Sequence, residues 1–163
     1  MLQGPGQFRE ALKKLLHTQG ECAQQLFGTL ESEREALAAG DAEQLDLLTR
    51  KKSDHLRQLE ALGREQQDLL DSLALEGSDA GLDTALAWCD PSDEMRQTRK
   101  DLLGRLERCR TLNERNGLTV QYRMGYVRRA LDVLNGDPAG TSNVYGRDGR
   151  ASSTVQSRLL ASG

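Results

Sequence analysis

The sequence predicts an all-α protein: an elongated antiparallel bundle of three long helices, with a short connecting helix and a flexible C-terminal tail. Three observations support this fold class. Apolar residues recur at steps of three or four through most of residues 1–135, which is the helical period. Aromatic residues make up only 4% and charged residues 29% of the chain, so a narrow leucine seam is expected in place of a thick core. From residue 136 onward Gly, Ser and Thr are frequent, which is typical of a flexible segment.

The first helix is expected over residues 8–38. Apolar side chains keep a helical spacing from Phe8 onward, after the helix-breaking stretch at residues 4–6. Gly40 then suits the left-handed conformation at the end of a helix, and Asp41 with Gln44 predicts an N-cap with a reciprocal capping box. Because this turn is short, the next helix should run antiparallel to the first.

The second helix is expected over residues 41–75, which carry an almost unbroken heptad seam of leucines. Lys52 and Gln66 interrupt this seam. We expect Lys52 to extend its ammonium group past the edge of the seam, and Gln66 to find a polar neighbour. A short helix is expected over residues 81–89, between two turn-forming stretches, with Trp88 covering the open end of the core.

The third long helix is expected over residues 92–135, with Ser92 as its N-cap. These residues include ten Lys or Arg and six Asp or Glu, a net charge of +4, whereas residues 41–75 include five and eight, a net charge of −3. The second and third long helices are therefore expected to face each other. Because an acidic helix of the same chain is available to the basic one, we expect no nucleic-acid partner.

The third helix is also expected to be longer than the other two, by roughly two to three turns. Its C-terminal turns would then be uncovered and would expose an apolar stripe that includes Val127, Leu131 and Leu134. Exposed stripes of this kind are usually binding surfaces. The same stripe also suits closure against a second copy of the chain, so a self-associating structural coiled coil is the alternative.

A structural polar notch interrupts the apolar face of the third helix. Asn113 and Asn116 lie three residues apart, and Gly117 follows within an otherwise regular helical pattern. A buried Asn requires a hydrogen-bond partner, and Gly in a helix costs about 1 kcal/mol relative to Ala. We expect Asn116 to fix the register of the bundle and Gly117 to let another helix approach closely. A polar contact point for a partner is the alternative.

Two domains are expected: a helical bundle domain at residues 1–135, and a flexible tail at residues 136–163 with a short binding motif. In the tail, apolar residues stand among polar ones at Val144 and Tyr145, and again from Val155 onward. Because Tyr is common among the residues that dominate binding energy, Tyr145 is the expected recognition anchor. Packing of Tyr145 against the chain's own bundle is the alternative.

The sequence gives no sign of an enzyme, and no metal or cofactor is expected. His17 and His55 stand outside any metal-ligand motif, and neither a nucleophile elbow nor a glycine-rich phosphate loop is found. Cys22, Cys89 and Cys109 are expected to be reduced packing residues. The sequence shows neither a signal peptide nor a membrane-spanning apolar stretch, so a cytosolic protein without direct membrane insertion is expected.

Three segments resemble the signature of the FlgN family of bacterial flagellar export chaperones. They are residues 112–117 (LNERNG), 129–134 (RALDVL) and 145–149 (YGRDG), in this order. The turn at Gly40 and Asp41, with the leucines and Lys52 that follow it, is similar to the first hairpin of that family. The resemblance is specific over residues 112–149.

The resemblance implies a cytosolic chaperone that binds the C-terminal helices of FlgK and FlgL, the hook-associated proteins at the junction of hook and filament. It implies that the chaperone prevents their premature assembly and delivers them to the type III export gate, so that it is transiently at the inner membrane. The expected client-binding residues are Val120, Met124, Val127, Ala130, Leu131 and Leu134. The residues expected to dock to the cytoplasmic domain of the gate component FlhA are Tyr145, Gly146, Asp148 and Gly149.

Overall fold

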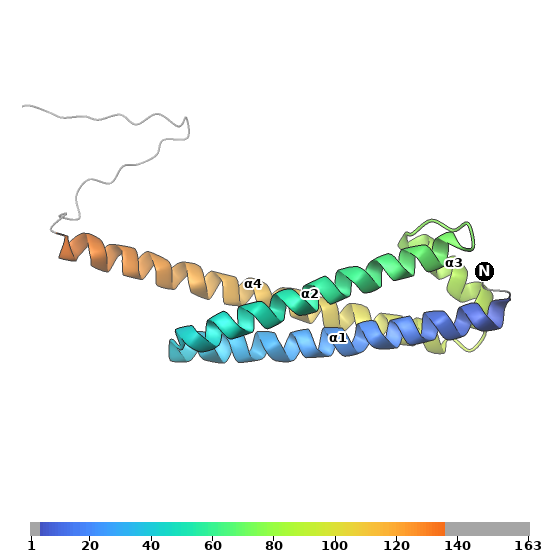
Figure 1. The fold of residues 1–163 in the computed structure, drawn as a ribbon, viewed down its shortest axis with the longest axis horizontal. Helices are drawn as coiled ribbons and strands as arrows, with labels where there is room; N and C mark the ends of the chain where they lie inside the picture. Colours follow the sequence, from blue (N-terminus) through green and yellow to red (C-terminus); the bar gives the residue numbers. More distant parts are fainter. Residues whose placement is uncertain (1–3, 136–163) are drawn as a thin grey trace, which may run out of the picture. The chain divides into compact units, whose positions relative to one another are not determined.

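A computed structural model describes residues 4–135 of the chain. All regular secondary structure in this range is helical, which confirms the all-α class: α1 at Pro5–Ala39, α2 at Ala42–Asp71, α3 at Asp79–Cys89 and α4 at Glu94–Leu134 (Figure 1). By its internal contacts the chain divides into two compact units, Met1–Tyr122 and Arg123–Gly163. The domain boundary that we predict after residue 135 coincides with the end of the described residues and stays a prediction.

Helices α1 and α2 form the predicted antiparallel hairpin (Figure 1). Gly40 has a φ of 72°, the left-handed conformation that favours glycine at the end of a helix. The Asp41 carboxylate accepts a hydrogen bond from the backbone N–H of Gln44 at 3.0 Å, which confirms the N-cap. The reciprocal half of the capping box is not formed, because the Asp41 N–H donates to the carbonyl oxygen of Ala36 at 3.1 Å and so closes the end of α1.

Helix α2 ends at Asp71 rather than at the predicted Leu75. Ala74 adopts a left-handed φ of 56°, and the Leu75 N–H donates to the carbonyl oxygen of Leu70 at 3.2 Å. A helix that closes in this way usually has glycine in the left-handed position. Because alanine stands there in this chain, the sequence carries no signal for the early end of the helix.

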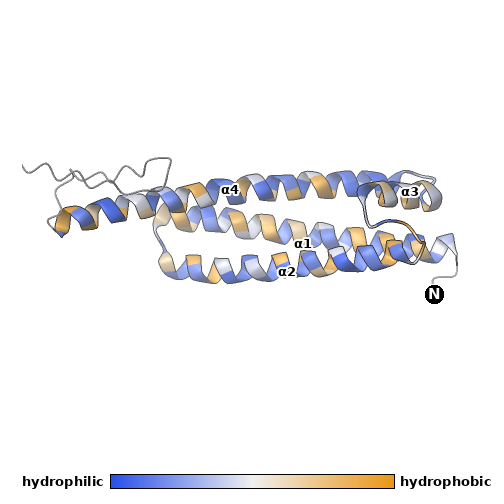
Figure 2. Ribbon diagram, turned by 90° about the horizontal axis from the view of Figure 1, so that it is seen from above, coloured by the Kyte–Doolittle hydropathy of each residue, from blue (hydrophilic) through white to orange (hydrophobic). Residues whose placement is uncertain are grey.

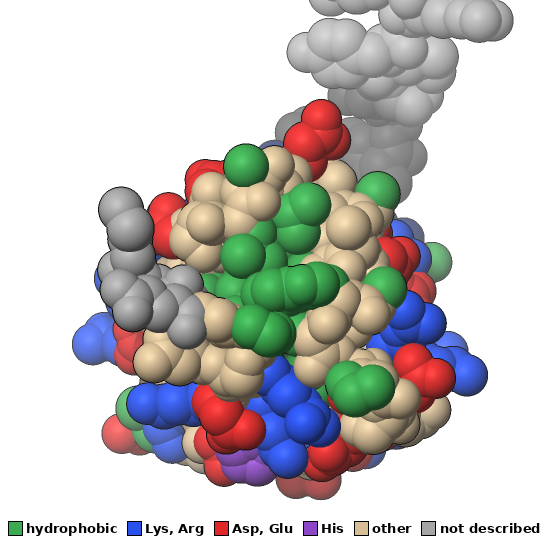
Figure 3. Space-filling model, turned by 90° about the vertical axis from the view of Figure 1, so that its right-hand side faces the viewer, with side chains coloured by type: hydrophobic (Ala, Val, Ile, Leu, Met, Phe, Trp, Pro, Cys, Tyr) green, Lys and Arg blue, Asp and Glu red, His purple; other side chains and the backbone are tan. Residues whose placement is uncertain are grey.

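Helix α3 packs at the end of the first unit where α1 begins (Figure 1). The indole ring of Trp88 lies edge-on to the ring of Phe8, with centroids 5.8 Å apart, yet Trp88 remains 49% exposed. Trp88 therefore covers the end of the core only in part. Figure 3 looks onto this end and shows hydrophobic side chains gathered at its centre, with charged side chains around them. The core cluster beneath consists of Phe8, Leu12, Leu16, Ala23, Leu70, Leu82, Ala85, Leu86, Cys89, Met95 and Leu102.

Helix α1 is the central helix of the first unit. It buries residues along its whole length, from Phe8 to Leu37, whereas the buried residues of α2 are Leu48 and Leu70. Figure 2 shows α1 between α2 and the first part of α4, with hydrophobic residues distributed along it. A second core cluster extends this packing with Leu26 and Leu30 of α1 and Cys109 and Leu112 of α4.

The prediction that the second and third long helices face each other through opposite charges is not supported. The ion pairs that the described residues form between helices join α1 to α2, α1 to α4 and α3 to α4: Glu33 with Lys52, Lys13 with Glu94, and Arg99 with Asp79. Net charge did not decide which helices pack together, because α1 packs apolar side chains against both α2 and α4. Burial of apolar surface contributes more to helix packing than exposed ion pairs do.

The start of α4 also differs from the prediction, because Ser92 is not its N-cap. The helix begins at Glu94, and the buried carboxylate of Asp90 accepts hydrogen bonds from the Met95 N–H at 2.8 Å and from the Ser92 hydroxyl at 2.9 Å. Burial disfavours a charged carboxylate, but these hydrogen bonds and the Arg9 guanidinium outweigh it and lower the pKa of Asp90 from its ordinary value. An acidic side chain upstream of the helix therefore caps it.

Candidate functional site

Helix α4 changes from buried to exposed after Asn116, which is only 3% exposed. Every described residue from 117 to 135 is exposed. The predicted stripe lies in this part of the helix, and the exposure of its large side chains ranges from 41% at Val120 to 81% at Leu134. Its members are Val120, in the first unit, and Met124, Val127, Ala130, Leu131 and Leu134, in the second. Apolar side chains at helical spacing thus face solvent, as in a surface that binds a helix.

The same part of α4 exposes more apolar side chains than the predicted stripe contains. They are Leu118, Tyr122, Tyr126 and Val133, with exposures between 54% and 78%. The sequence prediction missed them because it followed only the positions that continue the core-facing seam of the helix. Their signal was the step of four from 118 to 122 and from 122 to 126, with apolar residues at all three positions.

A buried polar cluster joins three helices of the first unit just before α4 becomes exposed. The side-chain amide of Asn116 donates to the carbonyl oxygen of Leu30 at 2.9 Å and to the Glu33 carboxylate at 2.8 Å. The Lys52 ammonium donates to the other carboxylate oxygen of Glu33 at 2.6 Å, and to the side-chain oxygen of Asn113 at 3.2 Å. The Glu33 carboxylate of α1 is therefore held by both α2 and α4.

These contacts decide how the polar residues of the seam are used. Asn116 bonds to the chain itself, which supports its expected role in fixing the register of the bundle. Lys52 is used differently from the prediction, because its ammonium is paired with the Glu33 carboxylate, while its side chain stays 22% exposed. Gln66 has the expected polar neighbour, since it accepts a hydrogen bond from the Gln19 amide at 3.2 Å.

Gly117 is not a point where another helix comes close, contrary to our expectation. A Cβ atom built on Gly117 would meet no atom of another described element within 4 Å. The glycine therefore lies in open space on the exposed side of α4. Its use as a contact point for a partner, together with Asn113, stays a prediction.

The three cysteines are free and buried, as expected for packing residues. Burial raises the pKa of the Cys22 and Cys109 thiols, and burial together with the Asp90 carboxylate raises the pKa of Cys89. A raised thiol pKa keeps the reactive thiolate scarce at neutral pH. Packing is therefore a sufficient role for these side chains.

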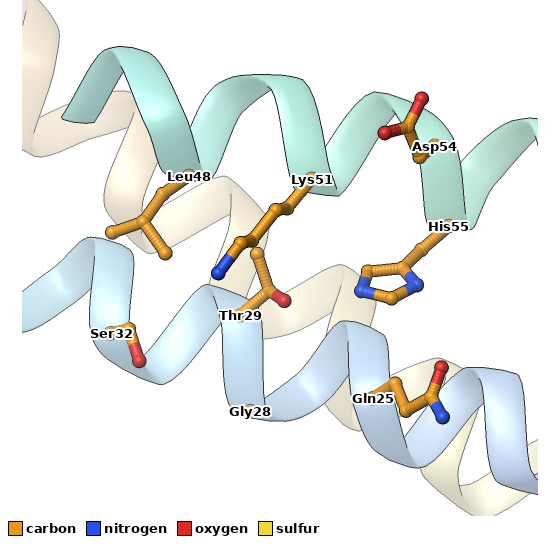
Figure 4. Close-up of a pocket in the computed structure, with 8 residues that line it drawn as sticks. All are labelled: Gln25, Gly28, Thr29, Ser32, Leu48, Lys51, Asp54 and His55. Carbon is orange, nitrogen blue, oxygen red and sulfur yellow. The ribbon is translucent and has the colours of Figure 1, made fainter. Parts of the chain in front are cut away.

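Several hollows lie between the helices of the first unit, and two of them lie beside Lys51 and Lys52. One, of about 500 Å³, lies between α1 and α2, where the side chains of Lys51 and His55 extend from α2 toward α1 (Figure 4). Most of the residues that line it are polar by type, although they present more apolar than polar surface: Gln25, Gly28, Thr29, Ser32, Leu48, Lys51, Asp54 and His55. The other, of about 270 Å³, is mostly apolar and lies over α1 between α2 and α4, lined by Leu26, Leu30, Lys52, Leu56, Leu59, Leu106, Cys109, Arg110 and Asn113. Neither hollow is lined by the exposed residues 117–135 of α4.

Comparison with protein families decides the identity of the chain. A model of the FlgN protein family matches residues 1–153, which include all four helices. The chain belongs to the FlgN family. The family resemblance of the three sequence segments is thereby confirmed, and the FlgN chain is a flagellar export chaperone. Comparisons with curated proteins and with solved structures gave no match.

The match with the FlgN family extends beyond the described residues. It includes Tyr145, Gly146, Asp148 and Gly149, whose expected role in docking to the export gate stays a prediction. Within residues 4–135, none of the helices combines the length and the apolar character needed to span a membrane. In the described part of the FlgN chain, most of the large exposed apolar side chains lie within residues 118–134 of α4.

Proposed function

We propose that this FlgN-family chaperone binds the C-terminal helices of the hook–filament junction proteins FlgK and FlgL with the exposed end of α4. The observation that carries the proposal is the exposed stripe in a chain of a chaperone family. An amphipathic client helix laid along this stripe would cover its apolar side chains, as in other helix-in-groove contacts. Each large side chain that becomes buried should contribute about 1 kcal/mol, since about half of its burial is still to be gained.

The same contact would prevent premature assembly of the client. A client helix that lies on α4 cannot at the same time pair with the helices of other client molecules. Because the contact uses a few apolar side chains on one helix, it should be reversible, which delivery requires. The chaperone would thus act by covering the client helix.

We further propose that the chaperone works in the cytoplasm and is transiently at the inner-membrane export apparatus. There Tyr145, Gly146, Asp148 and Gly149 would dock to the cytoplasmic domain of FlhA. The support is that the family match extends past residue 149 and so contains this segment. Client binding and gate docking would then use two adjacent parts of the chain.

Calorimetric titration of the full chain with the C-terminal helical peptide of FlgK or FlgL tests client binding. We expect a Kd below about 100 μM, or a binding free energy of at least about 5.5 kcal/mol. Leu131→Asp should weaken binding by about tenfold or more, because it places a carboxylate in an apolar contact. Gln121→Asp adds the same charge at an exposed polar position of α4 and should change the Kd by less than about twofold. No binding at about 100 μM contradicts the proposal.

Self-association is the alternative that the exposed stripe also supports. Sedimentation velocity of the wild type and of Leu131→Asp distinguishes the two functions. A monomeric wild type that binds the peptide supports the chaperone proposal. A larger species that Leu131→Asp converts to monomers, with no binding of the peptide, supports a structural coiled coil in its place.

A further inference from the structure

We propose that the end of α4 is held between two helices of one client molecule, rather than covered by a single helix. This inference rests on the proposed function and adds to it the class of client segment: a pair of amphipathic helices in one chain. It is argued from the helical residues of the second unit that the structure describes, residues 123–134.

The apolar surface of residues 123–134 is too wide for one partner helix. At about 100° of rotation per residue, its apolar side chains occupy an arc of about 180° around the helix. These side chains belong to Met124, Tyr126, Val127, Ala130, Leu131, Val133 and Leu134. Arg123, at the start of the segment, is the one charged residue whose position falls within this arc. A surface helix usually has an apolar stripe of about 100° or more, and the seam by which it packs on a single partner helix is narrower. A single client helix would therefore leave a large part of the arc in water.

The arc consists of two halves. The stripe half contains Met124, Val127, Leu131 and Leu134, and the tyrosine half contains Tyr126 and Val133, which are both about 70% exposed. Tyr is one of the residue types that carry most of the binding energy in protein interfaces, and Val133 is a largely exposed apolar residue beside it. The tyrosine half therefore has the composition of a second binding surface.

Charge indicates what binds the tyrosine half. The exposed Arg129 borders the tyrosine half on the helix surface. The Nε atom of Arg129 donates a hydrogen bond to the Gly125 carbonyl oxygen of the same helix, at 3.3 Å. Residues 123–134 contain three Arg and one Asp, a net charge of +2. Two copies of the chain that paired through their tyrosine halves would bring like charges together, which is unfavourable. The fitting occupant is an amphipathic helix flanked by carboxylates.

The two halves lie on the same three turns of helix, so the two partner helices would also touch each other. If both belong to one client chain, binding of the first helix raises the effective concentration of the second without a further loss of translational freedom. A pair of helices from one client is therefore favoured over two separate proteins. The end of α4 would then be the third helix of a three-helix contact.

Titration of the full chain with two probes tests this inference: full-length FlgK, and the isolated C-terminal helical peptide of FlgK. Leu131→Asp, in the stripe half, should weaken the binding of both probes. Val133→Asp, in the tyrosine half, should weaken the binding of full-length FlgK by about tenfold or more, and should weaken the peptide much less. Gln121→Asp is the matched charge control, and circular dichroism checks that the helix content of each variant equals that of the wild type.

Two results would overturn the two-helix contact while leaving the proposed function intact. In one, Val133→Asp binds full-length FlgK as tightly as Gln121→Asp does, while Leu131→Asp binds it weakly. In the other, Val133→Asp weakens both probes equally, so that one helix covers the whole arc. If Leu131→Asp binds both probes as the wild type does, the proposed function itself fails.

Discussion

Among single residues, Glu33 is a buried carboxylate of the first unit that needs hydrogen-bond partners from two other helices. It lies on the central helix, is buried, and accepts hydrogen bonds from Lys52 of α2 and from Asn116 of α4. A buried carboxylate is tolerated only when its oxygens are paired, because removing the charge from water is costly. The hydrogen bonds to Glu33 therefore hold α1, α2 and α4 in one register, and substitution of Glu33 should be costly.

Replacing Glu33 with Ala should lower the free energy of unfolding by about 3 kcal/mol, because Lys52 and Asn116 would lose their shared partner while staying partly or wholly buried. Urea unfolding followed by circular dichroism measures this difference. Glu35→Ala removes the same group from an exposed position of the same helix and should change stability by less than about 0.5 kcal/mol. Similar stabilities of the two variants would show that the cluster does not hold the helices together.

The sequence predicted that Asn116 needs a partner but did not identify Glu33. Its only signal was that Glu33 follows Leu26 and Leu30 at the helical step and precedes Leu37, so a charge stands at a seam position. Which polar residues meet depends on how the helices are arranged in space. Such pairs become visible only when the fold is known.

At the scale of the helix, the start of α4 depends on a side chain outside it. The Asp90 carboxylate caps the helix, and the hydrogen bonds that it accepts outweigh burial and lower its pKa. A carboxyl group with a lowered pKa in the folded chain stabilises it fully above the unfolded value of about 3.9. This stabilisation is lost as the pH falls through the folded pKa. Acid should therefore loosen the start of α4.

Asp90→Asn should lower the free energy of unfolding by about 1 to 2 kcal/mol at pH 7, as the loss of a helix cap does. At pH 3 the difference between wild type and variant should be smaller, because below the unfolded pKa of about 3.9 the unfolded wild-type chain takes up a proton more readily than the folded chain does. Chemical denaturation at the two pH values measures both differences. Asp93→Asn, at an exposed position of the same loop, is the control. A difference that is equal at pH 7 and pH 3 would exclude a role for the ionised carboxylate.

Helix existence was predictable from the sequence, whereas helix ends were predictable only where local rules apply. The turn at Gly40 and the N-cap at Asp41 follow the usual residue preferences and were predicted correctly, although the reciprocal half of the capping box is not formed. Two other helix ends break those preferences. Helix α2 ends with Ala74 in the left-handed conformation, and the start of α4 is capped by Asp90. Each is stabilised by contacts that do not appear in a local pattern.

At the scale of the whole chain, apolar periodicity and the three signature segments were enough for the all-α class and the family. The central place of α1 was not predictable from net charge, since it follows from apolar side chains on two of its sides. The exposure of Val127, Leu131 and Leu134 agrees with the stripe expected from the helix lengths. Their use in client binding stays a proposal.

Hydrogen exchange of the full chain, with and without the C-terminal helical peptide of a junction protein, locates the client contact most directly. Amide protection reports where a helix is stabilised on binding. We predict that the peptide slows exchange at residues 120–134 and leaves the amides of α1 and α2 unchanged. Slower exchange within residues 5–71, with no change at residues 120–134, would contradict client binding by the end of α4.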